Sequence, residues 1–394
     1  VKVYAPRGPE LDSYLETVES FNTREDSPTS WVEDVYAGDD FLEKLPEAGE
    51  GGFVILSGNN RDKARYIIEA VRKGYNVLSD KPMAITSQDY AVLEEAYSEA
   101  AGKGTVVYDL MTERYEILNV LAKEFLSDRR LFPTGADTVD IMDVHHFYKE
   151  VLGKPTLRPA WYYDVKQQGE GIADVTTHFI DLIFWELFPG EAVGTESIEN
   201  LEASHYPTVI SPGQYGMSTG ETAFPDYLEE YADGAGNIEV MANGDIGFDV
   251  NGTHVHIGVR WDFMPEHEGI SDSFCQRIRS EKTELRILQD AQTGYRRELF
   301  ISTADREALQ DVLSGLSDRF PELSAEDAGE SCFRIVVPSE YRSSHEDHFS
   351  KVARRFISLV NGEGLPEWER TNTLTKYYIT TEAVRTAERN YHGK

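Results

Sequence analysis

The chain has 394 residues, of which 40% are hydrophobic and 11% aromatic, so it can form two or three domains and is not disordered. Its 38 Lys and Arg against 70 Asp and Glu give a net charge of −32, which makes nucleic acid and anionic membrane surfaces poor partners. The two cysteines, Cys275 and Cys332, exclude a disulfide scaffold and a cysteine-rich zinc site. The sequence contains no run of 18 apolar residues, which a membrane-spanning helix would need. A cytoplasmic and a periplasmic location are both compatible with the sequence.

The first 130 residues alternate predicted strands and helices. The residues 1–5 predict a strand, and the apolar run 53–56 predicts another that is buried on both faces. Further strands are expected at 75–78 and 105–110, with helices over about 61–74, from a Thr86 capping box to about 102, and over about 113–126. Such units predict a parallel sheet that binds ligands at the carboxyl ends of its strands.

The pattern changes from about residue 137. A strand is expected at 140–147 and a helix over 171–188, whereas 190–235 is polar with few periodic signals. Asn-Gly pairs at 243–244 and 251–252 predict hairpins, and apolar and polar residues alternate between Thr253 and Trp261. The remaining expected elements are strands at 284–288, 298–301 and 333–337 and helices over about 345–360 and 373–389. We therefore expect an α/β domain over 1–136 and an α+β domain over 137–394, whose last helices pack back on the first.

A lysine lies at the carboxyl end of one predicted parallel strand. Lys81 stands in Ser79-Asp80-Lys81-Pro82-Met83, directly after the strand 75–78, so its side chain can point into the ligand crevice. The alternative is a solvated loop lysine before a proline, which the spacing alone favours.

A polar stripe runs along the predicted helix 171–188. Asp174, His178 and Asp181 fall at i, i+4 and i+7 on an otherwise apolar helix. A histidine there can exchange a proton near neutral pH, with Asp174 positioning it. An ordinary solvated face explains the stripe about equally well.

Residues between the strand 140–147 and this helix could bind a sugar. Lys149, Arg158, Trp161 and Tyr162 combine aromatic rings with cationic donors, although core packing and salt bridges account for them about as well. The predicted strand places the rings of His145 and His146 on opposite faces of the sheet, so at most one of them can line a pocket. No metal site is expected, because His254 and His256 lack a third ligand at recognisable spacing.

Together these motifs resemble the Gfo/Idh/MocA family of nicotinamide-dependent oxidoreductases. Asp80-Lys81-Pro82 matches its Glu-Lys-Pro motif with Asp replacing Glu, and Asp174 and His178 behind Gly169 and Gly171 match its Asp-x-x-x-His helix. Arg114-Tyr115 looks like its Arg-aromatic pair, and 158–164 and 167–186 look like a subgroup with a distinctive oxidoreductase C-terminal domain. The resemblance implies a Rossmann-like domain followed by an open antiparallel sheet with helices.

The resemblance also implies an activity. The chain would transfer hydride between NAD or NADP and a hydroxyl carbon of a sugar, glycoside or polyol, as a homo-oligomer, either a dimer or a tetramer. Lys81 would hold the hydroxyl, His178 would act as general base, and Asp174 would hold a hydroxyl or orient the histidine. The implied cofactor contacts are Arg7, Ser57, Asn59, Asp80, Lys81, Pro82 and Arg114, and the implied substrate contacts are His146, Lys149, Arg158, Trp161, Tyr162 and Thr177.

One departure from the family pattern affects the cofactor. The residues 1–5 align best with the family's second strand, so we expect the first strand, the phosphate-binding glycine turn and the first helix to be missing here. Arg7 stands where an acid would hold the ribose, which favours NADP slightly over NAD. Two alternatives stay open: an NAD-dependent glycoside hydrolase or lyase with transient oxidation, and a non-catalytic sugar-binding protein.

Overall fold

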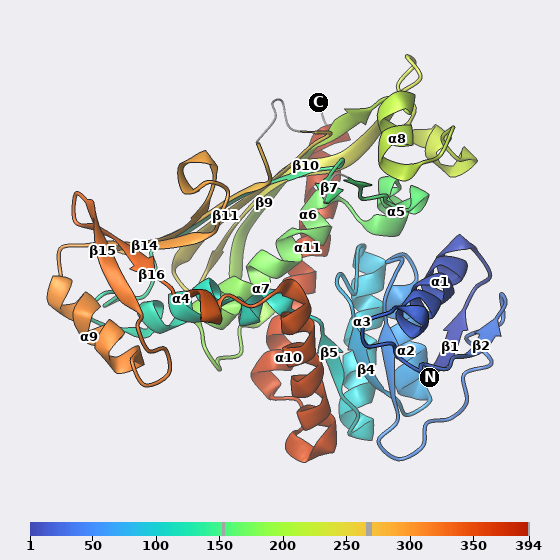
Figure 1. Ribbon diagram of the computed structural model, residues 1–394, viewed down its shortest axis with the longest axis horizontal. Helices are drawn as coiled ribbons and strands as arrows, with labels where there is room; N and C mark the ends of the chain where they lie inside the picture. Colours follow the sequence, from blue (N-terminus) through green and yellow to red (C-terminus); the bar gives the residue numbers. More distant parts are fainter. Residues whose placement is uncertain (152–153, 265–269, 393–394) are drawn as a thin grey trace.

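The computed structural model describes residues 1–151, 154–264 and 270–392 (Figure 1). Its first part alternates strands and helices, as expected. The elements are β1 (Lys2–Ala5), α1 (Pro9–Thr23), β2 (Asp34–Ala37), β3 (Phe53–Leu56), α2 (Lys63–Arg72), β4 (Asn76–Ser79), α3 (Ser87–Lys103), β5 (Val107–Asp109), a 3₁₀ turn η1 (Thr112–Tyr115) and α4 (Ile117–Ser127).

Local chemistry explains the helices of this part. The helix α2 buries Ala64, Ile67, Ile68 and Val71 on one face. The helix α3 begins at the predicted capping box, in which the Asp89 backbone N–H donates to Thr86 Oγ1 at 3.1 Å.

The parallel strands lie in two sheets. β1 pairs with β2, and β3, β4 and β5 form a separate three-stranded sheet in that order. The expectation that residues 53–56 are buried on both faces is wrong, since Phe53 is 51% exposed and Ile55 is 60% exposed. β3 lies at the edge of its sheet, whereas the central strand β4 is buried along its whole length.

The second part is built on a nine-stranded sheet in the order β15-β16-β14-β13-β12-β6-β11-β10-β9. We expected an antiparallel sheet, but the sheet is mixed, because its central strands β6 and β11 run parallel. The strands are β6 (Thr138–His146), β9 (Ile198–Ile210), β10 (Ile238–Val250), β11 (Thr253–Asp262), β12 (Ser273–Arg279), β13 (Thr283–Gln289), β14 (Glu298–Thr303), β15 (Ser324–Gly329) and β16 (Cys332–Val336), and β7 (Glu150–Val151) pairs with β8 (Lys154–Pro155) outside this sheet.

Of the two predicted hairpin turns, one is confirmed. Asn251 and Gly252 connect β10 to β11 with φ of 48° and 84°, as a two-residue hairpin requires. Asn243 and Gly244 lie inside β10 instead, next to a register shift against β9. There the Asn243 Oδ1 accepts a hydrogen bond from the Trp261 backbone at 2.7 Å, so the Asn-Gly pair marks an irregular strand rather than a turn.

The polar stretch 190–235 is more ordered than expected. It contains the long edge strand β9 and the helix α8 (Pro212–Thr219), which begins at a Ser211–Gln214 capping box. Since β9 exposes polar side chains along its length, its alternation was hidden in a generally polar segment. Other helices and strands without a sequence prediction include α1, β2, β7, β8, β12, β15 and α9 (Arg306–Leu316).

Helices cover one face of the large sheet and connect it to the first part (Figure 1). They include α6 (Gly171–Asp174), α7 (Thr176–Leu187) and α11 (Glu367–His392), and the core of the large sheet also takes in the apolar face of α4. The last helices, α10 (His345–Ser358) and α11, place Phe356 and Tyr377 in apolar clusters of the first part. The domain boundary that we expect between residues 136 and 137 stays a prediction.

No helix in the described ranges is long and apolar enough to cross a membrane.

A buried carboxyl between α7 and β12 generates a prediction about stability. Burial raises the pKa of Glu186 to about 8, and Gln276 Nε2 donates to its Oε2 at 2.9 Å. The folded state therefore holds this proton between pH 4.5 and 8, where the unfolded chain has released it, and stability falls as the pH rises through that window.

We predict that Glu186→Gln stabilises the fold by about 2–4 kcal/mol at pH 8.5 and much less at pH 5. Urea unfolding at both pH values measures the difference, and Glu19→Gln, at an exposed position of α1, is the matched control. An equal gain in the free energy of unfolding at both pH values would contradict a raised pKa of the Glu186 carboxyl.

Candidate active site

Loops at the carboxyl ends of β3 and β4 face the segment that precedes α6. Asn59 Nδ2 donates to Gln167 Oε1 at 2.6 Å, and the Asn60 backbone N–H donates to the Gln167 carbonyl at 2.9 Å. These bonds join residues 107 and 108 positions apart in the sequence, so they bring the strand ends of the first part against the second.

Lys81 and Asp174 meet in this region. Lys81 Nζ donates to Asp174 Oδ1 at 2.6 Å, and Gln168 Nε2 donates to Asp174 Oδ2 at 2.9 Å. Burial alone would lower the pKa of Lys81 and raise that of Asp174, but their mutual attraction reverses both directions, so both groups are charged at neutral pH. The Lys81–Pro82 peptide bond is cis.

His178 lies one turn beyond Asp174, after a break at Val175 that divides the expected helix into α6 and α7. Burial, reinforced by the positive charge of Lys81, lowers the pKa of His178 to about 4. Its Nδ1 is buried without a hydrogen-bond partner in the described part of the chain. The imidazole is therefore neutral at physiological pH and can accept a proton.

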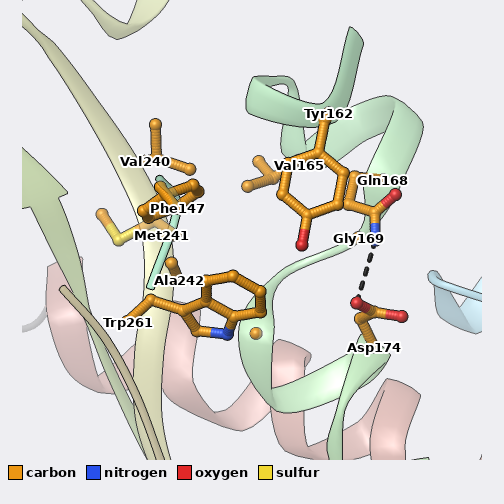
Figure 2. A pocket seen from close by; sticks show the side chains of 11 residues that line it. Phe147, Tyr162, Val165, Gln168, Gly169, Asp174, Val240, Met241, Ala242 and Trp261 are labelled. Atoms are coloured by element: carbon orange, nitrogen blue, oxygen red, sulfur yellow. Dashed lines mark hydrogen bonds between the residues drawn. The ribbon is translucent and has the colours of Figure 1, made fainter. Parts of the chain in front are cut away.

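An aromatic pocket opens beside Asp174 (Figure 2). Tyr162 and Gln168 project into it from the side of Asp174, and Trp261 and Phe147 form other parts of the wall. The full lining is Phe147, Tyr162, Val165, Gln168, Gly169, Gly171, Asp174, Val240, Met241, Ala242 and Trp261. The pocket thus combines carboxylate and amide groups on one side with apolar surface on the other.

Arg158 supports this pocket from behind. Its guanidinium lies 4.3 Å from the Tyr162 ring centroid and 5.3 Å from that of Trp261, and its Nε donates to the Phe147 carbonyl at 2.7 Å. These contacts fix the orientation of the aromatic wall.

Several predicted substrate contacts lie outside this pocket lining. Lys149 and His146 bond to Asp272, and His146 lines a different hollow, with Asp262 and Tyr295. Thr177 of α7 is fully buried and donates its hydroxyl to the backbone carbonyl of Ala173 in α6 at 2.6 Å. Trp161 has a buried Nε1 for which the described residues offer no partner.

The predicted cofactor contacts differ in exposure. Arg7 follows β1 and Ser57 follows β3, and both are exposed. Asn59, which bonds to Gln167, and Asp80, which directly precedes Lys81, are partly buried. The Asp80 carboxylate accepts a hydrogen bond from the Lys81 backbone at 2.9 Å and so shapes the loop. No group of three or more His, Cys, Asp or Glu in the described ranges could hold a metal ion.

Arg114 belongs to a buried network of ion pairs. Its guanidinium bonds both oxygens of Asp181, at 2.6 and 2.7 Å, and also pairs with Glu369 at 2.8 Å. Lys376 joins the same network through Asp181 at 2.9 Å and Asp109 at 2.8 Å. These partners fully engage Arg114, which favours a supporting role over direct cofactor contact.

The sequence patterns did not single out three polar or aromatic residues of the pocket lining: Gln168, Phe147 and Trp261. Trp261 lies on β11, where the alternation of apolar and polar residues suggested only a core position. It is buried, and it also lines the pocket. Gln168 stands directly before Gly169 of the recognised motif, and this position was the one available signal for it.

Comparison with known proteins identifies the family. Residues 133–388 match the family described as "Putative oxidoreductase C terminal domain". The crystal structure described as "a putative oxidoreductase from Parabacteroides merdae" is 36% identical, with a TM-score of 0.93 over 99% of this chain and 92% of that chain. The chain therefore belongs to this oxidoreductase family.

Two further proteins show weaker similarity, one in sequence and one in fold. "Putative oxidoreductase YteT" of Bacillus subtilis is 24% identical over 153 residues, which are 38% of this chain and about a third (33%) of that protein. A levoglucosan dehydrogenase, solved in complex with NADH and levoglucosan, has a TM-score of 0.62 at 15% identity, covering 99% of this chain and 89% of that chain.

The buried network generates a second prediction. Lys376→Met should destabilise the fold by about 3–5 kcal/mol, because Asp109 and Asp181 lose a buried cation that they share. Chemical denaturation measures the change. Lys166→Met, which breaks an ion pair with Glu230 at a lysine side chain 63% exposed, should cost less than about 1 kcal/mol. Equal costs for the two variants would contradict this assignment.

Proposed function

We propose that the protein is a nicotinamide-dependent dehydrogenase or reductase that acts on a neutral sugar, glycoside or polyol. The observation that carries the proposal is the Lys81–Asp174 pair, 2.6 Å apart, with the neutral imidazole of His178 one turn further along the chain. Alcohol oxidation needs a cation near the oxygen and a proton acceptor, and this site supplies both. A fold neighbour solved with NADH and levoglucosan supports the cofactor and substrate class.

The loops that follow β3 and β4 offer a binding place for the nicotinamide end of NAD or NADP. Gly58 has a φ of 108° and open space where a Cβ would lie, so a ligand can approach the backbone between Ser57 and Asn59. We assign the nicotinamide contacts to this loop and to Asp80–Pro82, with Arg7 near the adenosine end. The bound nicotinamide would supply the hydride acceptor or donor.

The residues of the chain divide the remaining work. Lys81 Nζ donates a hydrogen bond to the substrate oxygen and stabilises the negative charge that develops there. Asp174 holds Lys81 in place, and Gln168 holds the second oxygen of Asp174. The imidazole of His178 accepts the hydroxyl proton in oxidation and returns it in reduction. Trp261 and Tyr162 offer aromatic surface to the carbon face of the sugar.

Removing the base should abolish most of the activity. We predict that His178→Asn lowers kcat by about 10²–10⁴-fold, because the hydroxyl proton loses its acceptor. Formation of reduced nicotinamide with a panel of neutral sugars measures the rate. His254→Asn is the control, since this imidazole is largely exposed on the large sheet and bonds to Asp249. Unchanged turnover in His178→Asn would exclude the assigned base.

Removing the cation tests the other half of the site. Lys81→Met should lower kcat by about 10²–10³-fold, as the developing oxyanion loses its donor. The control is Lys44→Met, at a lysine whose side chain is 57% exposed and pairs with Asp40.

Three results would redirect the proposal. Product formation without net nicotinamide reduction would support the hydrolase or lyase hypothesis. Failure to bind either cofactor would support a non-catalytic sugar-binding protein. Full activity of Lys81→Met would refute the assigned chemistry.

A further inference from the structure

A second lysine lies buried next to the site. Lys63, the first residue of α2, is only 1% exposed, and its Nζ donates to Asn60 Oδ1 at 2.6 Å. Among the described residues, no carboxylate lies within ion-pair distance of this ammonium group, and buried charge without such a partner is costly. A lysine at the protein surface would avoid this desolvation cost. The burial of Lys63 therefore suggests that its ammonium group serves a function.

The hydrogen bond to Asn60 leads to the Lys81–Asp174 pair by way of Gln168. Asn60 Nδ2 donates to the backbone carbonyl of Gln168 at 2.7 Å, and the side-chain Nε2 of the same glutamine donates to Asp174 Oδ2 at 2.9 Å. The other oxygen of Asp174 accepts from Lys81 at 2.6 Å. An ammonium group can only donate, so Lys63 requires the oxygen of the Asn60 amide and thereby directs its NH₂ group to Gln168.

We propose that Lys63 is a positioning residue of the site: its ammonium group fixes the Asn60 amide, and through Gln168 it holds Asp174 against Lys81. The inference rests on the proposed dehydrogenase function and extends it to a residue outside the pocket lining. Loss of the proton from Lys63 weakens the bond to Asn60, because a charge-assisted hydrogen bond becomes a neutral one.

The surroundings of Lys63 make this loss accessible near physiological pH. Burial lowers its pKa to about 8, although the carboxylates of Asp80, Asp174 and Asp109 act to raise it, and the charge of Lys81 lowers it further. The pKa of Lys81 is instead raised above its ordinary value. Deprotonation of Lys63 therefore precedes that of Lys81 as the pH rises.

The test compares pH profiles of kcat and KM. In the wild type, kcat should fall along an alkaline limb centred near pH 8. Lys63→Arg keeps the charge and should move this limb upward by at least one pH unit. Lys63→Met should lower kcat about ten-fold or more at pH 7 with little change in KM, and should lack the limb. Arg65→Met removes an exposed cation of the same helix and should match the wild type.

Asn60→Asp provides a second variant in case Lys63→Met does not fold. It keeps an oxygen for Lys63 but removes the NH₂ group that reaches Gln168. We expect a lower kcat together with an alkaline limb at higher pH, because the new carboxylate stabilises the ammonium group. A wild-type limb and kcat in both Lys63→Arg and Asn60→Asp would overturn the proposal.

A readout that does not depend on turnover separates this inference from the proposed function. The side-chain amide NMR signals of Asn60 and Gln168 should titrate near pH 8 in the wild type and not in Lys63→Arg. If the wild type turns over no sugar, the proposed function fails. The titration still decides whether Lys63 orients the amides of Asn60 and Gln168. Amide signals that do not titrate would refute the inference even in an active enzyme.

Discussion

The fold depends on a buried network of five charged groups, in which Arg114 and Lys376 pair with three carboxylates. Asp109 at the end of β5 and Asp181 on α7 share Lys376 of α11, and Asp181 also holds Arg114 with two hydrogen bonds. Removal of Lys376 would leave Asp109 without a cation, and removal of Arg114 would leave Glu369 without one, in an environment that excludes water. Because these residues come from the first part, from α7 and from the last helix, the network joins segments that are far apart in the sequence.

This network also sets the rotation of α7. With Asp181 fixed against Arg114 and Lys376, the residue one turn earlier, His178, is directed to the same side of the helix. Asp174, one turn earlier again, reaches Lys81. The members of the predicted polar stripe thus differ in their contacts: Asp181 holds the helix, whereas Asp174 pairs with Lys81 and His178 is the base that we propose.

Patterns within single elements predicted much of the fold. The capping box at Thr86, the alternation along β11 and the strand before Lys81 all rest on neighbouring residues, and the structure bears them out. The parallel pairing of β6 with β11 could not be predicted, since it depends on how the chain enters the large sheet. The site divides in the same way. Motif residues such as Lys81 and Asp174 could be named from the sequence, whereas Gln168 and Lys63 matter only through partners that the fold brings to them.

The charges around the pocket constrain what it can bind. In a chain with a net charge of −32, an anionic substrate would need a cation that is free to receive it. Lys81 is paired with Asp174, and Arg158 donates to the carbonyls of His146 and Phe147 and lies over aromatic rings. Each cation is therefore already neutralised or engaged, and a phosphate or carboxylate would meet Asp174 without a compensating charge. A hydroxyl group faces no such penalty, because it can accept from Lys81 and donate to a carboxylate or an imidazole at once. The same pairing that keeps Lys81 charged thus supports the neutral alcohol that we propose as substrate over an acidic sugar.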